Sequence, residues 1–202
     1  GMTRGVALAF VWRTGTAMGR QLREVRAVLF GGDDTLVRAF VAPDGRRGHI
    51  APVPRAAEAL AGVRRAGLPV GVVGGMRGGG VQPLGGSSEA SRRAQMGRFL
   101  GPFDTWQSCD HGPRHRCACR APAPGLVLQA AAEMGVASHR VAVISDMGPD
   151  MKAAQAAGAV GILVPSRHTL RAEMGEVPLV APDLISAVRA VLGMDRSWVP
   201  GH

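Results

Sequence analysis

The chain alternates short apolar, β-branched runs with longer segments of helical periodicity, and this alternation limits its possible folds more than any other feature. We expect strands and helices to take turns over residues 25–30, 54–66, 68–73, 87–100, 103–108, 125–134, 141–144, 148–157, 160–164 and 182–192, beginning with a strand. Such βα units place helices on both faces of a mostly parallel sheet. The sequence therefore predicts an α/β protein with a Rossmann-like, three-layer α/β/α core.

The length of 202 residues suits one well-buried domain. We assign residues 25–193 to this domain, residues 2–24 to a basic N-terminal extension and residues 194–202 to a C-terminal tail. Whether the extension packs on the domain or engages another protein stays open. Its apolar run, Val6 to Trp12, is shorter than a membrane span and precedes no clear cleavage site. We expect a cytoplasmic protein with no membrane contact.

The net charge is +9, and it comes mainly from arginines that are spread along the chain, such as Arg23, Arg64 and Arg92. A nucleic-acid binder would gather cations on one face with aromatic residues between them, yet this chain has no tyrosine. Binding to nucleic acid is therefore disfavoured. The positive field remains compatible with an acidic or phosphorylated ligand.

Ligands of parallel α/β sheets bind beyond the carboxyl ends of the strands. The residues that follow Phe30, Val73, Ser108 and Ile144 are therefore the candidates for a site. The glycine-rich segment at 74–80 is not a Walker loop, because no Gly-Lys-Ser/Thr follows it.

The most specific chemical pattern is CDHGPRHRCACR at residues 109–120, which contains all three cysteines of the chain. Cys109, His111, Cys117 and Cys119 have the spacing C-x-H-x5-C-x-C. Three thiolates and one imidazole suit a tetrahedral, structural Zn2+. His115 is an alternative to His111 as the fourth ligand. Free thiols, or one disulfide with a cysteine left over, are the competing interpretation.

Together these residues resemble the haloacid dehalogenase superfamily, specifically its group of heptose-bisphosphate and histidinol-phosphate phosphatases. That group has a zinc loop that ends in C-x-C-R-K-P-x-P-G, which CACRAPAPG at 117–125 resembles. Its C-x-H half is matched at 109–111, which favours His111 over His115. The resemblance covers roughly Val25 to Leu192. The connection from Leu36 to Pro54 is too short for a large cap domain.

The resemblance implies roles for the segment VLFGGDDTLV at residues 28–37. The superfamily's first motif is D-x-D-x-T, in which the first Asp is the nucleophile and the second the general acid and base. In this chain Gly31 stands at the nucleophile position, Asp33 at the acid/base position and Thr35 at the hydroxyl position. Gly31 cannot attack phosphorus. Asp33 and Asp34 are also typical of a simple turn.

Two further catalytic positions are vacant by the same comparison. Gly74 stands where the second motif has a Thr or Ser, and Ala121 stands where the third motif has a Lys. Arg120, beside it, is a candidate to face an anionic ligand. The fourth motif, G-D-x-x-x-D, is matched by SDMGPD, with Asp146 and Asp150 as Mg2+ ligands. The nucleophile is normally a third carboxylate ligand, so we expect weakened Mg2+ binding.

These losses predict a pseudophosphatase that retains the fold and the zinc loop and binds a phosphorylated ligand or a partner protein. The alternative is an active Mg2+-dependent phosphomonoesterase in a shifted register, with Asp33 as nucleophile and Thr35 at the acid/base position. That register leaves the substitutions at Gly74 and Ala121 unexplained. A nucleic-acid-associated protein is the third possibility.

Overall fold

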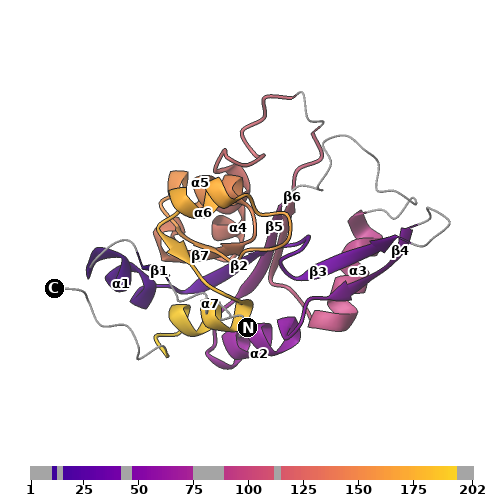
Figure 1. Ribbon diagram of the computed structural model, residues 1–202, viewed down its shortest axis with the longest axis horizontal. Coiled ribbons are helices and arrows are strands. Elements are labelled where there is room, and N and C mark those ends of the chain that lie inside the picture. The colour runs from indigo at the N-terminus through magenta and orange to yellow at the C-terminus, as the bar shows by residue number, and fades with distance from the viewer. Residues whose placement is uncertain (1–10, 13–15, 42–46, 75–88, 112–114, 195–202) are drawn as a thin grey trace, which may run out of the picture.

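A seven-stranded sheet forms the centre of the computed structural model (Figure 1), which describes residues 11–12, 16–41, 47–74, 89–111 and 115–194. The strand order is β1-β9-β8-β7-β2-β5-β6. Neighbouring strands are parallel, except that β1 is antiparallel to β9. The strands are β1 (Val11–Trp12), β2 (Ala27–Gly31), β5 (Val70–Gly74), β6 (Thr105–Ser108), β7 (Val141–Ser145), β8 (Val160–Leu163) and β9 (Leu179–Val180).

Helices cover both faces of this sheet, which confirms the three-layer α/β/α architecture. Figure 1 shows α2 and α7 on one side of the sheet and α4 and α5 on the other. Among the described residues, no helix combines the length and apolarity needed to span a membrane. The helices are α1 (Thr16–Arg23), α2 (Ala56–Arg65), α3 (Glu89–Leu100), α4 (Gly125–Glu133), the 3-10 helix η1 (Ser138–Arg140), α5 (Gly148–Ala156), α6 (Arg171–Glu176) and α7 (Leu184–Val191).

The two faces of β2 support separate halves of the core. Val28 and Phe30 pack into a cluster with residues of α2, α3 and α7, whereas Ala27 and Leu29 pack into a second cluster with α4 and α5. Successive side chains of a strand point to opposite faces, so a strand covered on both sides must be apolar throughout. This is why β2 is one continuous apolar run that leads directly to the candidate site.

The connection from Leu36 to Pro54 contains a small antiparallel pair of strands, β3 (Val37–Val41) and β4 (Arg47–Pro52). The sequence pattern did not predict these strands. They follow the first motif immediately, and Leu36 and Val37, at the start of the pair, are fully buried. The connection therefore holds a two-stranded element and no large cap, as expected from its length.

The N-terminal region contributes α1, whose Leu22 is only 4% exposed and belongs to the main core cluster. The Gln21 amide nitrogen donates a hydrogen bond of 3.0 Å to the carbonyl oxygen of Gly158. Residues 16–24 thus pack on the domain. The predicted boundary at residue 25 and the role of the extension remain predictions. Residues 2–10, 13–15 and 195–202 lie outside the described part.

Candidate functional site

The carboxyl ends of β2, β5, β6 and β7 meet at one edge of the sheet, as the motif positions required. Gly31 pairs in register with Val73, and Gly74 pairs with Ser108. Ser145 ends β7, the strand on the other side of β2. The first, second and fourth motifs are therefore neighbours in space, at the edge where ligands of such sheets bind.

Gly31 has no room for a side chain. A Cβ atom built at this position would lie 2.7 Å from the Oγ of Ser145 and 2.9 Å from the Oγ1 of Thr35. Both distances are shorter than ordinary contacts of a Cβ atom. The space into which a nucleophilic carboxylate would project is thus occupied by the hydroxyl of Ser145.

Asp33, at the acid/base position, is engaged by a cation. Its carboxylate forms an ion pair with the guanidinium of Arg92 on α3, and both side chains are more than four-fifths buried. Asp33 lies two residues beyond the end of β2. Asp34 follows in the left-handed conformation, with φ of 56°, which Asp adopts more readily than most residues. Asp33 therefore belongs to a tight turn as well as to the candidate site.

Asp146 lies at the centre of a hydrogen-bond network and is 1% exposed. The Thr35 hydroxyl donates to its Oδ1 at 3.0 Å, and the Ser166 hydroxyl donates to its Oδ2 at 2.6 Å. Thr169 donates to its backbone carbonyl at 2.6 Å. The fold thus brings Thr35 and Asp146 together, although they are 111 positions apart in the chain.

Asp150, the second carboxylate of the fourth motif, is held differently. Its Oδ2 accepts a hydrogen bond of 2.6 Å from the hydroxyl of Ser145. Ser145 therefore contacts the second carboxylate of this motif and also fills the space beside Gly31. Thr35 and Ser145 tie the first motif to the fourth.

Gly74 and Ala121 lie near each other, as their motif assignments required. They line a small void of about 20 Å³ together with Asp150. Gly74 has φ of 151°, a conformation that favours glycine, so a Thr or Ser there would be strained. Arg120 donates to the backbone carbonyl of His111, while its Nε is buried without a hydrogen-bond partner among the described residues.

The second void of the site, about 30 Å³, lies beside Asp33 and is lined by Gly32, Gly74, Arg92 and Trp106 among others. A water molecule needs a volume of about 10–15 Å³ by this kind of measure. Each void therefore has room for only about one to three water molecules. Arg92 fills the space beside Asp33.

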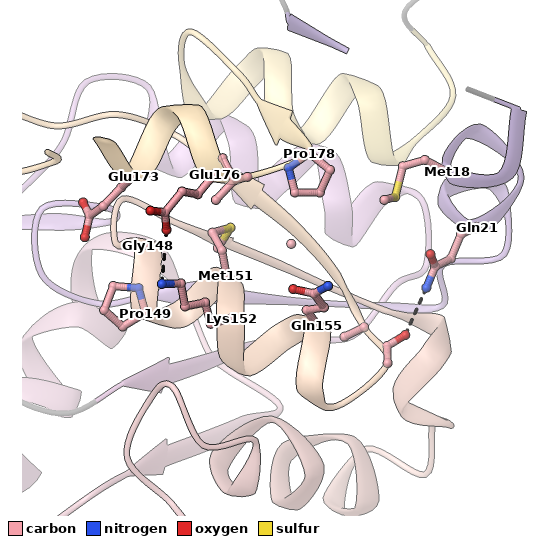
Figure 2. A pocket seen from close by; sticks show the side chains of 14 residues that line it. Met18, Gln21, Gly148, Pro149, Met151, Lys152, Gln155, Glu173, Glu176 and Pro178 are labelled. Carbon is pink, nitrogen blue, oxygen red and sulfur yellow. Dashed lines mark hydrogen bonds and ion pairs between the residues drawn. The ribbon is translucent and has the colours of Figure 1, made fainter. Parts of the chain in front are cut away.

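A larger cavity, of about 430 Å³, lies between α1, α5 and α6 (Figure 2), and Gly148 and Pro149 of the fourth motif line one side of it. Met18 and Met151 contribute apolar surface, and Lys152 and Glu176 form an ion pair of 3.1 Å beside it. Its volume falls in the range of small-molecule sites. None of the predicted site residues lines it, so its size is no guide to the location of the phosphatase chemistry.

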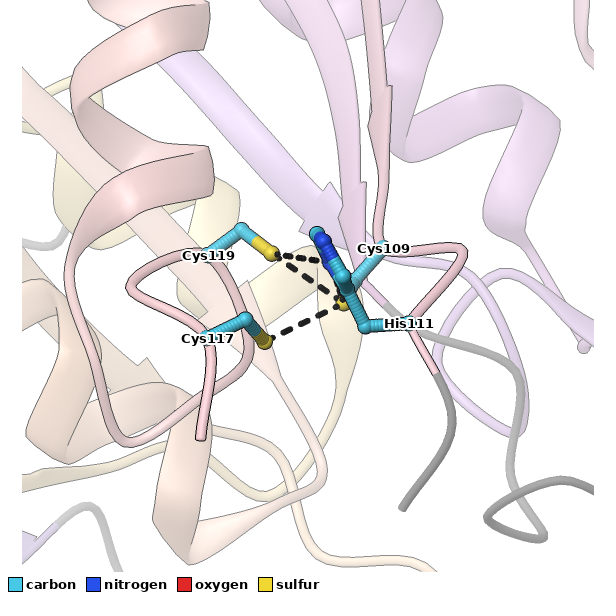
Figure 3. Close-up of side chains that lie close together, drawn as sticks. All are labelled: Cys109, His111, Cys117 and Cys119. Atoms are coloured by element: carbon cyan, nitrogen blue, oxygen red, sulfur yellow. Dashed lines mark hydrogen bonds between the residues drawn. The ribbon is translucent and has the colours of Figure 1, made fainter. Parts of the chain in front are cut away.

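The predicted zinc ligands gather in the loop between β6 and α4 (Figure 3). The ligand atoms of Cys109, His111, Cys117 and Cys119 lie within 4.8 Å of one another. The Sγ atoms of Cys109 and Cys117 are 3.6 Å apart, and the Nδ1 of His111 is 3.1 Å from the Sγ of Cys119. Two thiolates on one tetrahedral Zn2+ are separated by roughly 3.7 Å. The cluster therefore fits a tetrahedral metal.

The structure supports neither a disulfide in this loop nor His115 as the fourth ligand. All three cysteines are free thiols, without a disulfide. His115 is not part of the four-ligand group, and its ring centroid lies 5.7 Å from that of His111. His111 is therefore better placed than His115 to complete a metal site.

The surroundings of Cys117 and Cys119 shift the pKa values of these two thiols in opposite directions. Hydrogen bonding from the backbone of Arg120 lowers the pKa of Cys117 to about 6. The neighbouring Cys109 and burial raise the pKa of Cys119 to about 12. Three closely spaced thiols cannot all ionise without a cation between them, because like charges repel. Cys117 is thus an acidic thiol, and the cluster would need a metal to ionise all three.

Sequence reasoning missed four residues of the site: Ser145, Arg92, Ser166 and Thr169. A signal existed for Ser145 alone, because the fourth motif has a glycine where SDMGPD begins with serine. Arg92 comes from the middle of α3 and the other two from the loop after β8, where no motif drew attention to them.

Comparison with known proteins agrees with this fold. A family model described as HAD-hydrolase-like matches residues 118–188. The D-glycero-β-D-manno-heptose-1,7-bisphosphate 7-phosphatase of Pseudomonas putida is 30% identical over 148 residues, which cover 70% of this chain and 85% of the relative. The enzyme of the same name from Helicobacter pylori strain J99 is 47% identical over 45 residues, or 22% of this chain and 26% of the relative.

Solved structures show the same fold. The crystal structure of the D,D-heptose 1,7-bisphosphate phosphatase from B. bronchiseptica, complexed with magnesium and phosphate, has a TM-score of 0.67 and 22% identity. The match covers 84% of this chain and 99% of that one. A HAD-like phosphatase from Mesorhizobium loti has a TM-score of 0.60 and 23% identity, with 83% and 87% covered.

The α/β/α fold, with motif positions at the carboxyl ends of β2, β5 and β7, defines a protein of the haloacid dehalogenase class. This chain belongs to that superfamily, and within it to the family of the D-glycero-β-D-manno-heptose-1,7-bisphosphate 7-phosphatases.

Proposed function

We propose that the protein is a pseudophosphatase, which keeps the phosphatase scaffold and does not turn over phosphate esters. The observation that carries this proposal is the exchange at Gly31 and Ser145. Gly31 offers no nucleophile. The hydroxyl oxygen of Ser145 lies 2.7 Å from the position that a Cβ atom of residue 31 would occupy. The space of the missing carboxylate is therefore filled by the Ser145 hydroxyl and is not empty.

The remaining motif positions support the same conclusion. Removal of a nucleophile typically costs several orders of magnitude in rate, and loss of one electrostatic contact to the reacting group costs about 10²–10³. Gly74 and Ala121 supply no such contact. Asp33 is paired with Arg92, so the acid/base position is not free to exchange a proton with a substrate.

The competing function is an active phosphomonoesterase that uses Asp33 as the nucleophile. Asp33 lies beyond the strand end in a turn, and its carboxylate contacts a guanidinium. An attack on phosphorus would require Arg92 to move away. The shifted register would also place the Thr35 hydroxyl at the acid/base position, but that hydroxyl is 2% exposed and bonded to Asp146.

We further propose a structural Zn2+ at Cys109, His111, Cys117 and Cys119. The spacing of the ligand atoms and the acidic thiol of Cys117 support it. A metal held there would join the end of β6 to the start of α4 and would close all four coordination positions with protein. Its role would be to stabilise the fold.

A phosphorylated ligand or a partner protein would bind at the old active-site edge, and the partner protein is better supported. The described site has voids of only about 30 and 20 Å³. Asp33 and the guanidinium of Arg92 line the first void, and Asp150 lines the second without a cation beside it among the described lining residues. A phosphoryl group would meet more carboxylates than cations there, which is electrostatically unfavourable.

A steady-state phosphatase assay with Mg2+ tests the proposal. The substrates are D-glycero-β-D-manno-heptose 1,7-bisphosphate and a panel of sugar, amino-alcohol and nucleotide monophosphates. We expect no turnover above background from the natural protein. We also expect none from Gly31→Asp alone, because the new side chain would collide with Ser145.

The double variant Gly31→Asp/Ser145→Gly removes that collision, and Gly31→Asn/Ser145→Gly is its matched control without a nucleophile. Only the Asp variant is expected to gain turnover, at a trace level because positions 74 and 121 stay empty. Turnover by the natural protein that Asp33→Asn abolishes would overturn the proposal and establish the active enzyme instead.

A further inference from the structure

Mg2+ takes six oxygen ligands in nearly octahedral geometry, usually one or two carboxylates together with water or phosphate oxygens. The family pattern supplies carboxylates at three positions, which correspond to Gly31, Asp146 and Asp150. In the described part of this chain, the only cluster of three or more His, Cys, Asp or Glu ligand atoms is the one in the cysteine loop. The donor set at the old metal site is therefore incomplete.

The carboxylate of Asp146 already has a hydroxyl on each oxygen. Thr35 donates to Oδ1 and Ser166 donates to Oδ2. Each carboxylate oxygen has about two lone-pair sites, so the hydroxyls take one site on each oxygen of Asp146, and their protons would repel a cation placed beside them. The buried charge of Asp146 is thus compensated by neutral donors.

Asp150 is compensated in the same way, by the hydroxyl of Ser145 at 2.6 Å. The Oγ of Ser145 also occupies the space beside Gly31, where the third carboxylate would stand. One residue therefore fills the position of the missing ligand and engages a remaining one.

The hydrogen bonds of these hydroxyls are consistently oriented. A hydroxyl has one proton to donate and can accept from another group. Each of these hydroxyls donates to Asp146 or Asp150 and accepts from a backbone N–H: Thr35 from Asp146, Ser145 from Met147, Ser166 from His168 and Thr169 from Ser166. Each hydroxyl is thus satisfied as both donor and acceptor, and a buried polar network of this kind is rigid.

We propose that this network of hydroxyls replaces the divalent cation, so that the protein does not bind Mg2+ at the old active site. Ser145 is the positioning residue that excludes the metal. This inference rests on the proposed function, which it deepens by stating what has taken the place of the metal.

The test is direct binding of Mn2+, a paramagnetic substitute for Mg2+, to full-length protein loaded with Zn2+. Loss of the free Mn2+ signal in electron paramagnetic resonance measures binding without any need for activity. We compare the natural protein with Ser145→Gly, Gly31→Asp/Ser145→Gly and the uncharged control Gly31→Asn/Ser145→Gly. Thermal unfolding of each variant shows whether it is folded.

We expect no binding by the natural protein at millimolar Mn2+. The Asp double variant should bind at least about tenfold more tightly than its Asn control, the scale of effects on metal affinity from groups around a site. Two outcomes overturn the inference: Mn2+ binding by the natural protein that Asp146→Asn abolishes, or a folded Asp double variant no tighter than the Asn control. The Mn2+ measurement on the natural protein needs no double variant, so it tests the inference even if the double variants do not fold.

The two proposals fail separately. Mn2+ binding by a natural protein without phosphatase turnover would overturn the metal inference and leave the pseudophosphatase intact. Turnover by the natural protein in excess chelator would overturn the pseudophosphatase and leave the absence of the metal intact.

Discussion

Gly31 and Ser145 lie at the ends of neighbouring strands, and their side-chain sizes are complementary. The motif pattern has an aspartate at position 31 and a glycine at position 145, whereas this chain has a glycine at 31 and a serine at 145. Close packing makes such positions interdependent, because a side chain added on one strand must be removed from the other. At the scale of the residue, the pseudophosphatase proposal therefore rests on the coupled change at Gly31 and Ser145.

Thr35→Val tests how strongly the hydroxyl network stabilises the protein. The substitution preserves the shape of the side chain but leaves the Asp146 N–H without its acceptor and Oδ1 without its donor. Because the site is buried, we expect a loss of about 1–3 kcal/mol in the free energy of unfolding, measured by urea denaturation. Thr35→Ser, which keeps the hydroxyl, is the control and should lose less. Equal losses would show that only packing matters there.

Zinc affinity should fall as the pH falls. Cys119, with its pKa raised to about 12, is protonated at neutral pH in the free cluster and must release its proton when metal binds. Cys117, with its pKa lowered to about 6, is already ionised above pH 6 and releases no proton when the metal binds. Below pH 6 it is protonated and must release one proton. Affinity should therefore fall about tenfold per pH unit for each proton released, and more steeply below pH 6.

A colorimetric chelator competition from pH 5 to 8 measures this dependence, with Cys109→Ala as the control that should bind no zinc. An affinity independent of pH would contradict metal binding through these thiols.

At the scale of elements, the N-terminal helix α1 is part of the folded unit. It contacts α7 and β8, and Leu22 and Met18 pack against the main core cluster. An amphipathic helix gains its stability from such packing, since its own propensity is small. The sequence left open whether residues 2–24 pack on the domain, and for residues 16–24 the structure provides the contacts.

Leu22→Ala should destabilise the whole domain. The side chain is 4% exposed, so its truncation leaves a cavity, and we expect a loss of about 2–5 kcal/mol. Arg20→Ala, at an exposed position of the same helix, is the matched control and should change stability by less than about 0.5 kcal/mol. Thermal and urea unfolding measure both. A neutral Leu22→Ala would mean that α1 does not belong to the cooperative unit.

At the scale of the whole molecule, the positive charge is dispersed. The described arginines serve separate local contacts: Arg55 pairs with Glu58, Arg92 pairs with Asp33, and Arg64 donates to the carbonyls of Leu100 and Pro102. Arg55 and Arg64 lie at opposite ends of α2, and Arg92 lies on α3. A net charge of +9 therefore does not by itself create a groove for a phosphate backbone.

Duplex DNA should accordingly bind only nonspecifically. At physiological salt we expect a dissociation constant no tighter than about 10⁻⁶ M, and it should weaken further as salt is added. Fluorescence anisotropy with a labelled 30-base-pair duplex measures this, and lysozyme at equal concentration is a control for a basic protein without a nucleic-acid site. Submicromolar binding that survives 0.2 M salt would support the nucleic-acid-associated alternative.

Much of the fold was predictable because its pattern is local. The strand at 25–30 was found as β2 and the helix at 125–134 as α4, each within two residues of its observed ends. The pair β3–β4 was missed because its strands are short and the prolines, glycines and arginines of the segment interrupt any regular alternation of apolar residues. The short strand β9 was missed because two residues show no period at all.

The sequence by itself determined the α/β class, the superfamily motifs and the cysteine cluster, because each depends on residue types at short spacings. Only the tertiary structure decided that Ser145 fills the space beside Gly31, that Arg92 holds Asp33, and that hydroxyls surround Asp146. These contacts join residues far apart in the chain. They exist because parallel strands bring their carboxyl ends to one edge, which no local pattern specifies.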